Sequence, residues 1–358
     1  MTELAEPPAG TPSRPPTTRA VAREAGVSKS LVSLVFNGGD NVSDARRHRV
    51  LHAAERLGYR PNRVAQSLSA GRRDFVAILV SNLHNPLFAE IVGAAKARLA
   101  EAGQRTMIVS AQVDDGGGAA VLDRDNIAVL RDLRPAGLIT VGTIPDFNQL
   151  ADLAASIPTV VAGAIDATDE VVATVRSDDA AGLDLVVAHL AEQGVERIAF
   201  VGGDGGTVSA SRAAAFQAAA ALRGFGDRAW IERADFTEVG ARRAVERLIA
   251  EERLPRAIVA VNDITAVGVI TALEAAGVPV PEGCRVAGYD DTMLAAIPRI
   301  SLTSVDPDNR RIGRVAAEAL LAGFEGALGE VLIPPRLVVR GSSTLTSTST
   351  PTAFSTPI

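Results

Sequence analysis

The chain has 358 residues and a net charge of −6, with 47% hydrophobic and 22% charged residues. This composition is typical of a folded globular protein of two or three domains and excludes a disordered chain. The single cysteine, Cys284, excludes an intramolecular disulfide and a cysteine-based metal site. No apolar run reaches the roughly 18 to 20 residues of a membrane span. The first residues lack the apolar core of a secretory signal, so we expect a cytoplasmic protein with no membrane partner.

Charge is distributed unevenly along the chain. Residues 17–74 hold eleven Lys and Arg against five Asp and Glu, a net of +6, whereas residues 75–341 have a net of −11. A small basic head on a large acidic body is the pattern expected when only the head meets a polyanion. A chance cluster of basic residues is the alternative.

The first 60 residues predict a disordered arm followed by short helices. Residues 1–16 contain five prolines and almost no large apolar side chain. Capping residues mark three helix starts: Thr17 or Thr18, Ser28, and Ser43. Gly26 and Gly58 are the expected ends of the first and third helices. A further short amphipathic stretch follows at 63–69.

From residue 75 to residue 341, short apolar runs alternate with helical patterns. The runs include 75–81, 106–110, 137–141, 159–163, 197–203, 257–261 and 285–289. Helical segments such as 88–102, 182–193 and 266–276 lie between them. Continuous apolar strands that alternate with helices indicate parallel sheets covered on both faces. Because the pattern restarts near residues 175–195, we expect two similar α/β lobes.

A short helix, a turn containing Gly26 and a capped second helix predict a helix-turn-helix. The second helix of this motif reads base edges in the major groove with small or polar side chains. Those expected to face outward are Lys29, Ser30 and Ser33. Those expected to face inward are Val32, Val35 and Phe36. A generic three-helix bundle is the alternative to a DNA-binding head.

Two runs, VAREAGVSKSLVSLVFN (21–37) and NVSDARRHRVLHAAERLGYRPNRVAQSLSAG (41–71), resemble the DNA-binding head of the lactose-repressor (LacI–GalR) family. The resemblance implies base-reading positions at Lys29, Ser30 and Leu34. Many members have Arg where this chain has Leu34, and leucine can meet a thymine methyl but cannot hydrogen-bond guanine. Leu34 could instead be a simple surface residue or serve helix–helix packing. Arg47, with Tyr59 and Asn62, is expected to contact phosphates.

Residues 62–70 resemble the hinge helix of the same family, whose leucine inserts into a minor-groove step. That leucine is Leu68 here. A nine-residue helix is marginal in water, so we expect it to become ordered when two copies pair on DNA. The resulting domain prediction is a disordered arm (1–16), a helix-turn-helix domain (17–60), a hinge helix and linker (61–74), a two-lobed effector-binding and dimerisation domain (75–341) and a disordered tail (342–358).

The body resembles the periplasmic-binding-protein-like core of this family. The motifs that carry the resemblance are 84–88, 197–203, 211–216, 261–263 and 288–291. Ligands of parallel sheets bind beyond the carboxyl ends of the strands. The resemblance implies effector contacts from Asn85, Phe88, Ser211, Arg212, Phe236, Asn262 and Asp290. This mixture of charged, amide and aromatic groups suits a polyol.

Simpler roles are open for several of these residues. Arg212 could be a solvated residue at a helix start, Asn262 and Asp290 could be turn or capping residues, and Phe236 could belong to the core. Ala164 and Ala215 stand where many family members have Arg and Gly, respectively.

No other motif indicates catalysis, a cofactor or a metal. The glycine-rich stretch 202–206 lacks the Lys-Ser/Thr of a phosphate-binding loop, and the four histidines show no catalytic arrangement. We expect a ligand-responsive transcriptional regulator, a repressor, that binds a pseudo-palindromic operator in double-stranded DNA as a homodimer. The expected effector is a sugar or related polyol, with a nucleoside as the alternative. The rival interpretation is a cytoplasmic sugar-binding protein or sugar-metabolising enzyme with a two-lobed α/β body.

Overall fold

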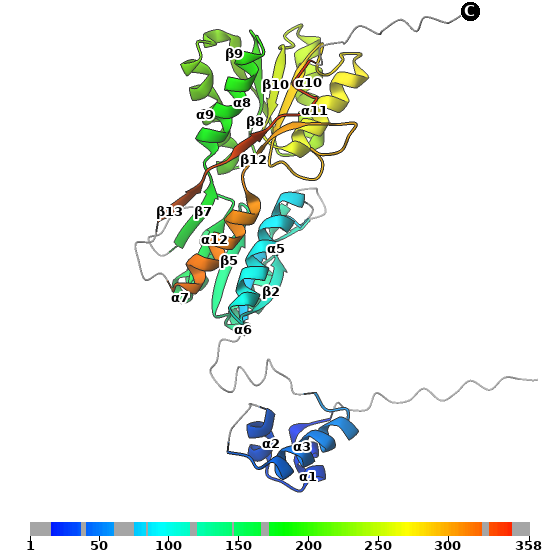
Figure 1. The fold of residues 1–358 in the computed structure, drawn as a ribbon, viewed down its shortest axis with the longest axis vertical. Coiled ribbons are helices and arrows are strands. Elements are labelled where there is room, and N and C mark those ends of the chain that lie inside the picture. Colours follow the sequence, from blue (N-terminus) through cyan, green and yellow to red (C-terminus); the bar gives the residue numbers. More distant parts are fainter. Residues whose placement is uncertain are drawn as a thin grey trace, which may run out of the picture. The chain divides into compact units, whose positions relative to one another are not determined.

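The computed structural model describes residues 16–36, 41–60, 75–83, 85–114, 120–144, 147–165, 172–323 and 329–345. The chain divides into a head, Met1–Arg73, and a body, Asp74–Ile358 (Figure 1). Residues 1–15 of the predicted arm (1–16) and the predicted hinge helix lie outside the described residues. Within the described part, no helix is both long and apolar enough to cross a lipid bilayer.

The head contains the three predicted helices, α1 (Thr18–Ala25), α2 (Lys29–Phe36) and α3 (Asp44–Arg56). The Thr17 hydroxyl accepts a hydrogen bond from the Ala20 amide at 3.3 Å, and Gly26 ends α1 in the left-handed conformation at φ 60°. The Ser28 hydroxyl caps α2 through the Leu31 amide at 3.2 Å. Ser43 precedes α3 as predicted, but its side chain makes no capping hydrogen bond.

The three helices of the head share one small apolar core. Val21, Val32 and Val50, one from each helix, are fully buried at its centre. Phe36 and Tyr59 pack at its edge with ring centroids 5.7 Å apart. This arrangement fixes which face of α2 points outward, because the buried valines hold the opposite face inside.

The body has two α/β lobes, each built on a six-stranded sheet (Figure 1). The first sheet has the order β13 (Glu330–Ile333), β7 (Val172–Ser177), β6 (Thr159–Ala162), β5 (Gly137–Val141), β1 (Phe75–Val80) and β2 (Arg105–Ser110). The second has the order β14 (Arg336–Val338), β12 (Thr303–Asp306), β11 (Arg285–Tyr289), β10 (Ala257–Ala260), β8 (Ile198–Gly203) and β9 (Ala229–Ala234). All strand pairs of these two sheets are parallel except β12 with β14. A small antiparallel hairpin, β3 (Gln112–Asp114) with β4 (Ala120–Leu122), follows β2.

Helices cover both faces of each sheet. In the first lobe they are α5 (Pro86–Glu101), α6 (Arg124–Leu133), η1 (Phe147–Leu150), α7 (Ala151–Ser156) and α12 (Asn309–Leu321). In the second they are α8 (Asp179–Glu192), α9 (Thr207–Leu222), η2 (Gly226–Arg228), α10 (Glu238–Ala250) and α11 (Asp263–Ala275). On β1, Ile78 packs with Ile91 of α5 and Ile312 of α12, while its neighbour Leu79 packs with Ile127 of α6. Successive side chains of a strand point to opposite faces, so a strand buried on both faces has a continuous apolar sequence.

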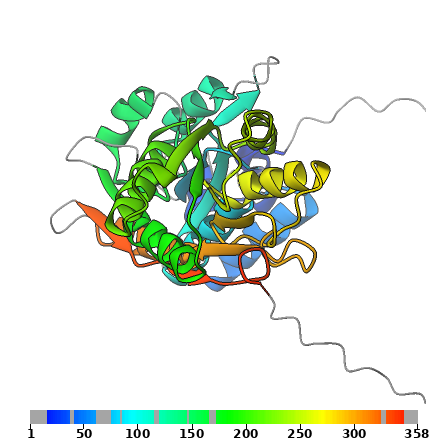
Figure 2. The same ribbon diagram turned by 90° about the horizontal axis from the view of Figure 1, so that it is seen from above.

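The chain passes between the lobes three times. The first passage follows β7, the second leads from β12 to α12, and the third joins β13 to β14. The orange-red segment that carries β13 and β14 crosses obliquely from the first lobe to the second (Figure 1) and lies at the margin of the body in the view from above (Figure 2). The predicted restart near 175–195 is therefore correct for the second lobe, but residues 309–333 return to the first.

The structure corrects two boundary predictions. The helices predicted at 88–102, 182–193 and 266–276 begin two or three residues earlier, directly after the polar caps Asn85, Asp178 and Asn262. Apolar spacing does not reveal a cap, so the predicted starts came too late.

The tail predicted as disordered from 342 is wrong at its beginning. Ser342 and Ser343 are buried, because the Ser342 hydroxyl donates to the Val286 carbonyl at 2.6 Å and accepts from the Thr303 amide at 2.8 Å.

Candidate functional site

The recognition face of the head lies on α2. Lys29, Ser30 and Leu34 are exposed, and Ser33 is half-buried. Residues three and four apart share one face of a helix, so these four side chains form one surface opposite Val32. Leu34 is 39% exposed. This exposure fits a base-reading residue or a plain surface residue better than a residue that packs helices together.

The residues predicted to contact phosphates lie in different surroundings. Arg47 lies on the first turns of α3 and is half-buried. The Tyr59 hydroxyl hydrogen-bonds to the Thr18 hydroxyl at 2.8 Å, so this tyrosine ties the end of the head to α1. Asn62 and Leu68 lie outside the described residues.

A cavity of about 180 Å³ lies at the carboxyl ends of the strands, between the two lobes. Its lining from the first lobe is Ser81, Asn82, Asn85, Leu87, Phe88, Gln112, Thr143 and Gly163. Its lining from the second lobe is Gly205, Val208, Arg212, Phe236, Asn262 and Asp290. Six of the seven predicted effector residues therefore meet at one cavity. Ser211 is not among its lining residues, because neighbours on a helix point about 100° apart and Arg212 takes the inward direction.

Two of the three cavity asparagines, Asn85 and Asn262, also cap helices. The Asn85 side-chain oxygen accepts from the Leu87 amide at 3.1 Å at the start of α5. The Asn262 oxygen accepts from the Thr265 amide at 2.8 Å at the start of α11. Both caps use the amide oxygen and leave the N–H₂ group for another partner. The capping role considered for Asn262 is thus correct, and it also fixes the side chain at the cavity wall.

Arg212 is the buried cation of the site, with 7% of the residue exposed. Its Nε lies 3.1 Å from Asp179 Oδ1, and its Nη1 lies 3.2 Å from Asp290 Oδ1 and 2.7 Å from the Val261 carbonyl oxygen. The guanidinium stacks on the Tyr289 ring at 3.7 Å. Burial opposes its charge, yet Asp290 and Asp179 outweigh this and raise its pKa. The alternative of a solvated residue at a helix start is therefore wrong for Arg212.

The carboxylates around Arg212 set the charge of the site. Burial raises the pKa of Asp290 to about 6, although the Arg212 cation acts in the opposite direction. Asp179 is buried at the start of α8, directly after the first passage between the lobes. The Arg212 guanidinium thus faces two carboxylates, of which Asp179 also lies 3.6 Å from Arg176 Nη1, and the cavity has no unmatched positive charge among its described lining residues.

Sequence reasoning missed several residues of this site. Ser81 and Asn82 follow β1, Thr143 follows β5, and Gly163 follows β6. The rule that ligands bind beyond the carboxyl ends of parallel strands, applied to every predicted strand, would have found them. Gly142 has φ 78°, and a Cβ there would collide with the Phe88 ring. No motif pointed to this close approach.

A head that presents one exposed helix face and a two-lobed α/β body with a polar cavity define a ligand-responsive DNA-binding regulator. Residues 17–62 match the family model of bacterial regulatory proteins of the lacI family, and residues 187–343 match a periplasmic binding protein-like domain. The chain is 32% identical over 336 residues to the HTH-type transcriptional repressor PurR of Photobacterium profundum, and the match covers 91% of this chain and 98% of that protein. The chain belongs to the lacI family of bacterial regulatory proteins.

Solved structures agree with this assignment. The lac repressor dimer bound to operator and the anti-inducer ONPF matches with a TM-score of 0.78 and 26% identity, over 93% of this chain and all of that one. The complex of the transcriptional regulator CelR with cellobiose matches with a TM-score of 0.65 and 27% identity, over 92% of this chain and all of that one. These relatives are transcriptional regulators rather than enzymes. The predicted fold class, a helix-turn-helix head with a two-lobed body, is confirmed.

Proposed function

We propose that this regulator represses transcription by binding a pseudo-palindromic operator as a homodimer, and that a small effector in the cavity between its lobes changes its affinity for that operator. The observation that carries the proposal is the cavity, which six predicted effector residues from both lobes line together. A ligand that contacts both lobes stabilises one arrangement of the lobes over others, and only such differential affinity can shift a conformational equilibrium. The solved lac repressor dimer on its operator supports the proposed assembly.

The proposed effector is an uncharged polyhydroxyl compound, a sugar or related polyol. Asp290 can accept from hydroxyl groups, the asparagine amides can donate to them, and Phe88 and Phe236 offer aromatic faces to the apolar side of a sugar ring. The charge of Arg212 is already matched by two carboxylates. An anionic ligand, such as a sugar phosphate, would thus find no unpaired cation among the described lining residues of the cavity. A nucleoside is the alternative within the uncharged class.

We propose further that the cavity binds its ligand without transforming it. The described lining residues include no histidine or cysteine, and the carboxylate of Asp290 is held by Arg212. The arrangement thus offers hydrogen bonds and an aromatic cover, but no activated nucleophile with a base beside it among those residues.

The test combines two measurements on the whole chain. A thermal-shift screen against neutral sugars, polyols, nucleosides and sugar phosphates identifies ligands, since a ligand of the folded state raises the melting temperature. A gel-shift assay on DNA from upstream of its own coding sequence then compares binding with and without each hit. The proposal expects a neutral hit that changes DNA binding. Stabilisation only by sugar phosphates would contradict the proposed effector class.

A further inference from the structure

Asp263 is a buried carboxylate directly behind the cavity wall. It is the first residue of α11 and follows Asn262, which lines the cavity. Its side chain is fully buried, and within the described part of the chain its carboxylate accepts hydrogen bonds from two uncharged residues, Thr292 and Ser304. A buried carboxylate that is held by neutral donors carries a high desolvation cost, so its retention calls for a role.

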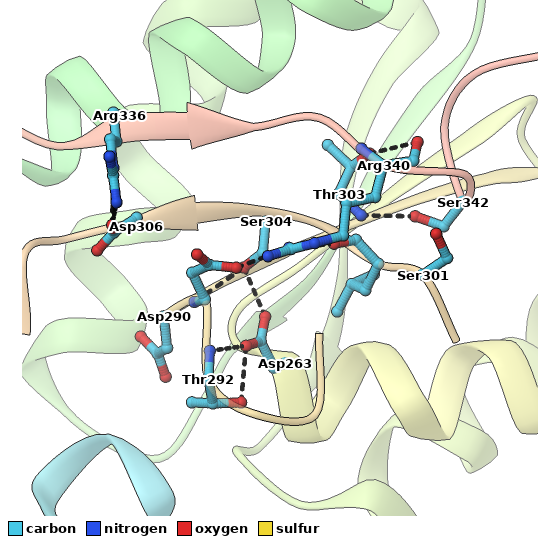
Figure 3. A network of polar contacts seen from close by, with 12 residues as sticks. Asp263, Asp290, Thr292, Ser301, Thr303, Ser304, Asp306, Arg336, Arg340 and Ser342 are labelled. Carbon is cyan, nitrogen blue, oxygen red and sulfur yellow. Dashed lines mark hydrogen bonds and ion pairs between the residues drawn. The ribbon is translucent and has the colours of Figure 1, made fainter. Parts of the chain in front are cut away.

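Three donors converge on the Asp263 carboxylate (Figure 3). The backbone amide and the hydroxyl of Thr292 donate to Oδ2 at 2.6 and 2.9 Å. The Ser304 hydroxyl donates to Oδ1 at 2.6 Å and itself accepts from the Asp291 amide at 3.1 Å. One carboxylate therefore holds two successive backbone amides, that of Thr292 directly and that of Asp291 through Ser304.

The segment held in this way contains strained backbone. Asp290 has φ 103° and Asp291 has φ 43°, in the left-handed region that residues other than glycine rarely adopt. Such strain persists only where the surroundings determine the backbone. The Asp290 amide donates to the Val305 carbonyl at 2.9 Å. The next two amides, of Asp291 and Thr292, both depend on Asp263.

The side chains of Asp290 and Asp291 point in different directions. Asp291 Oδ1 accepts from Arg340 Nη1 at 2.6 Å, whereas Asp290 Oδ1 lies 3.2 Å from Arg212 Nη1 at the cavity. Strand β11 can pass close to the Asp263 carboxylate because Gly288 has no side chain, and a Cβ there would lie 2.6 Å from Asp263 Oδ1.

We infer that Asp263 is a positioning residue for effector binding: it holds the backbone amides of Asp291 and Thr292 and thereby aims Asp290 into the cavity. This inference rests on the proposed function, because Asp290 matters to a ligand only if the cavity binds one. Asp263 is not among the lining residues of the cavity. It acts through Asp290 and needs no contact with the ligand.

The isosteric substitution Asp263→Asn separates this role from simple packing. An amide has one acceptor oxygen and one donor N–H₂ group. If its oxygen faces Thr292, its N–H₂ faces Ser304, and the Ser304 hydroxyl loses its acceptor. If the N–H₂ faces Thr292, two donors oppose each other. In the first orientation the neutral amide oxygen also accepts more weakly than a carboxylate, and the Ser304 O–H must turn away. Either orientation therefore weakens the hold on the two backbone amides, while the volume of the side chain stays the same.

The experiment measures hydrogen exchange of single backbone amides in the full-length chain, by mass spectrometry with fragmentation that resolves Asp291 from Thr292. Asp263→Asn should raise exchange at both amides at least tenfold. Ser304→Ala removes only the link to Asp291 and should raise exchange there alone. Thr292→Ser keeps both donors and should leave exchange unchanged. Asp227→Asn, an exposed position in the same lobe, is the matched control.

Unchanged exchange at both amides in Asp263→Asn would overturn the inference. So would a uniform rise that includes β10, because a general loss of stability affects all amides. The same variants are then titrated with D-glucose, D-galactose, D-ribose and cellobiose. Any sugar that binds the wild-type chain should bind Asp263→Asn at least tenfold more weakly, and equal binding would contradict the inference. Failure of every sugar with wild type would count against the proposed effector class, while the exchange pattern still decides the role of Asp263.

Discussion

Replacing Arg212 by methionine removes one charge from the centre of the body and keeps most of the side-chain volume. In the wild-type structure its guanidinium pairs with Asp179 at 3.1 Å and with Asp290 at 3.2 Å, and all three residues are buried. Without the cation, the buried Asp290 has no ion-pair partner among the described residues, while Asp179 keeps only a longer contact with Arg176, whose Nη1 lies 3.6 Å from its Oδ2. Arg212→Met should therefore destabilise the body and also weaken the binding of any ligand in the cavity.

The magnitude follows from the burial of the pair. Removing one partner of a buried ion pair costs about 3–5 kcal/mol, and we expect this loss near pH 8. Burial already raises the pKa of Asp290 to about 6 in the presence of Arg212, and loss of the cation raises it further. A carboxyl group whose folded pKa is raised destabilises the fold above that pKa and is relieved by protonation below it. The loss of stability should therefore shrink as the pH falls from 8 to 5.

Urea unfolding at several pH values provides the assay, because the fluorescence of Trp230, the single tryptophan, reports on the second lobe. The guanidinium carbons of Arg197 and Arg253 lie over the indole ring, 5.5 and 5.7 Å from its centroid. The exposed Arg310 offers a matched control, and Arg310→Met should change the free energy of unfolding by less than about 0.5 kcal/mol. Equal stability of Arg212→Met and wild type at pH 8 would refute the reasoning.

Three further predictions concern the head, the buried carboxylate and the corrected tail. Lys29→Ala should weaken binding to the specific operator by about 1–3 kcal/mol if it contacts a base, whereas Arg47→Ala should weaken all DNA alike and lower the salt slope by about one; fluorescence anisotropy at several salt concentrations separates the two. Burial and a neighbouring carboxylate raise the pKa of Asp263 to about 7. The folded state therefore binds this proton more tightly than the unfolded state, and the stability gained from it is complete below about pH 4 and is lost as the pH rises through 7. Asp263→Asn should flatten the pH dependence of the free energy of unfolding in urea between pH 4 and pH 7. An unchanged pH profile would count against the raised pKa of Asp263. Ser343→Ala removes a hydroxyl that lies 2.8 Å from His189 Nε2 and should cost about 1–3 kcal/mol of unfolding free energy; a loss near zero would mean that the segment at 342–345 contributes little to stability.

The fold was largely predictable because its signals are local. Each strand buried on both faces has a continuous apolar run, and the seven predicted runs all form strands of the two sheets. Strand β9, with the sequence AWIERA, was missed because it is only half-buried and mixes charged with apolar residues. The buried serines at 342 and 343 were missed for a similar reason: a Ser/Thr-rich stretch gives no sign that distant strands will offer it hydrogen-bond partners.

The candidate site was predictable in outline but not in its charge balance. Motif resemblance located Arg212 and Asp290, and both line the cavity. It did not locate Asp179, which pairs with Arg212 from a helix 33 positions earlier in the chain. Nor did it assign a role to Asp263, whose partners lie 29 and 41 positions away. Pairings of this kind depend on how the strands and helices of the second lobe bring distant segments of the chain together, and no local pattern encodes them.

The central claim is that a ligand in the cavity of the body changes how the head binds DNA. The most direct test measures the Kd of the full-length chain for operator DNA by fluorescence anisotropy, with and without a saturating neutral ligand found by thermal shift. The account predicts at least a tenfold change in Kd for wild type and no change for Asp290→Ala, which loses a hydrogen-bonding group of the cavity. A ligand that stabilises the protein but leaves the wild-type Kd for the operator unchanged would contradict the account.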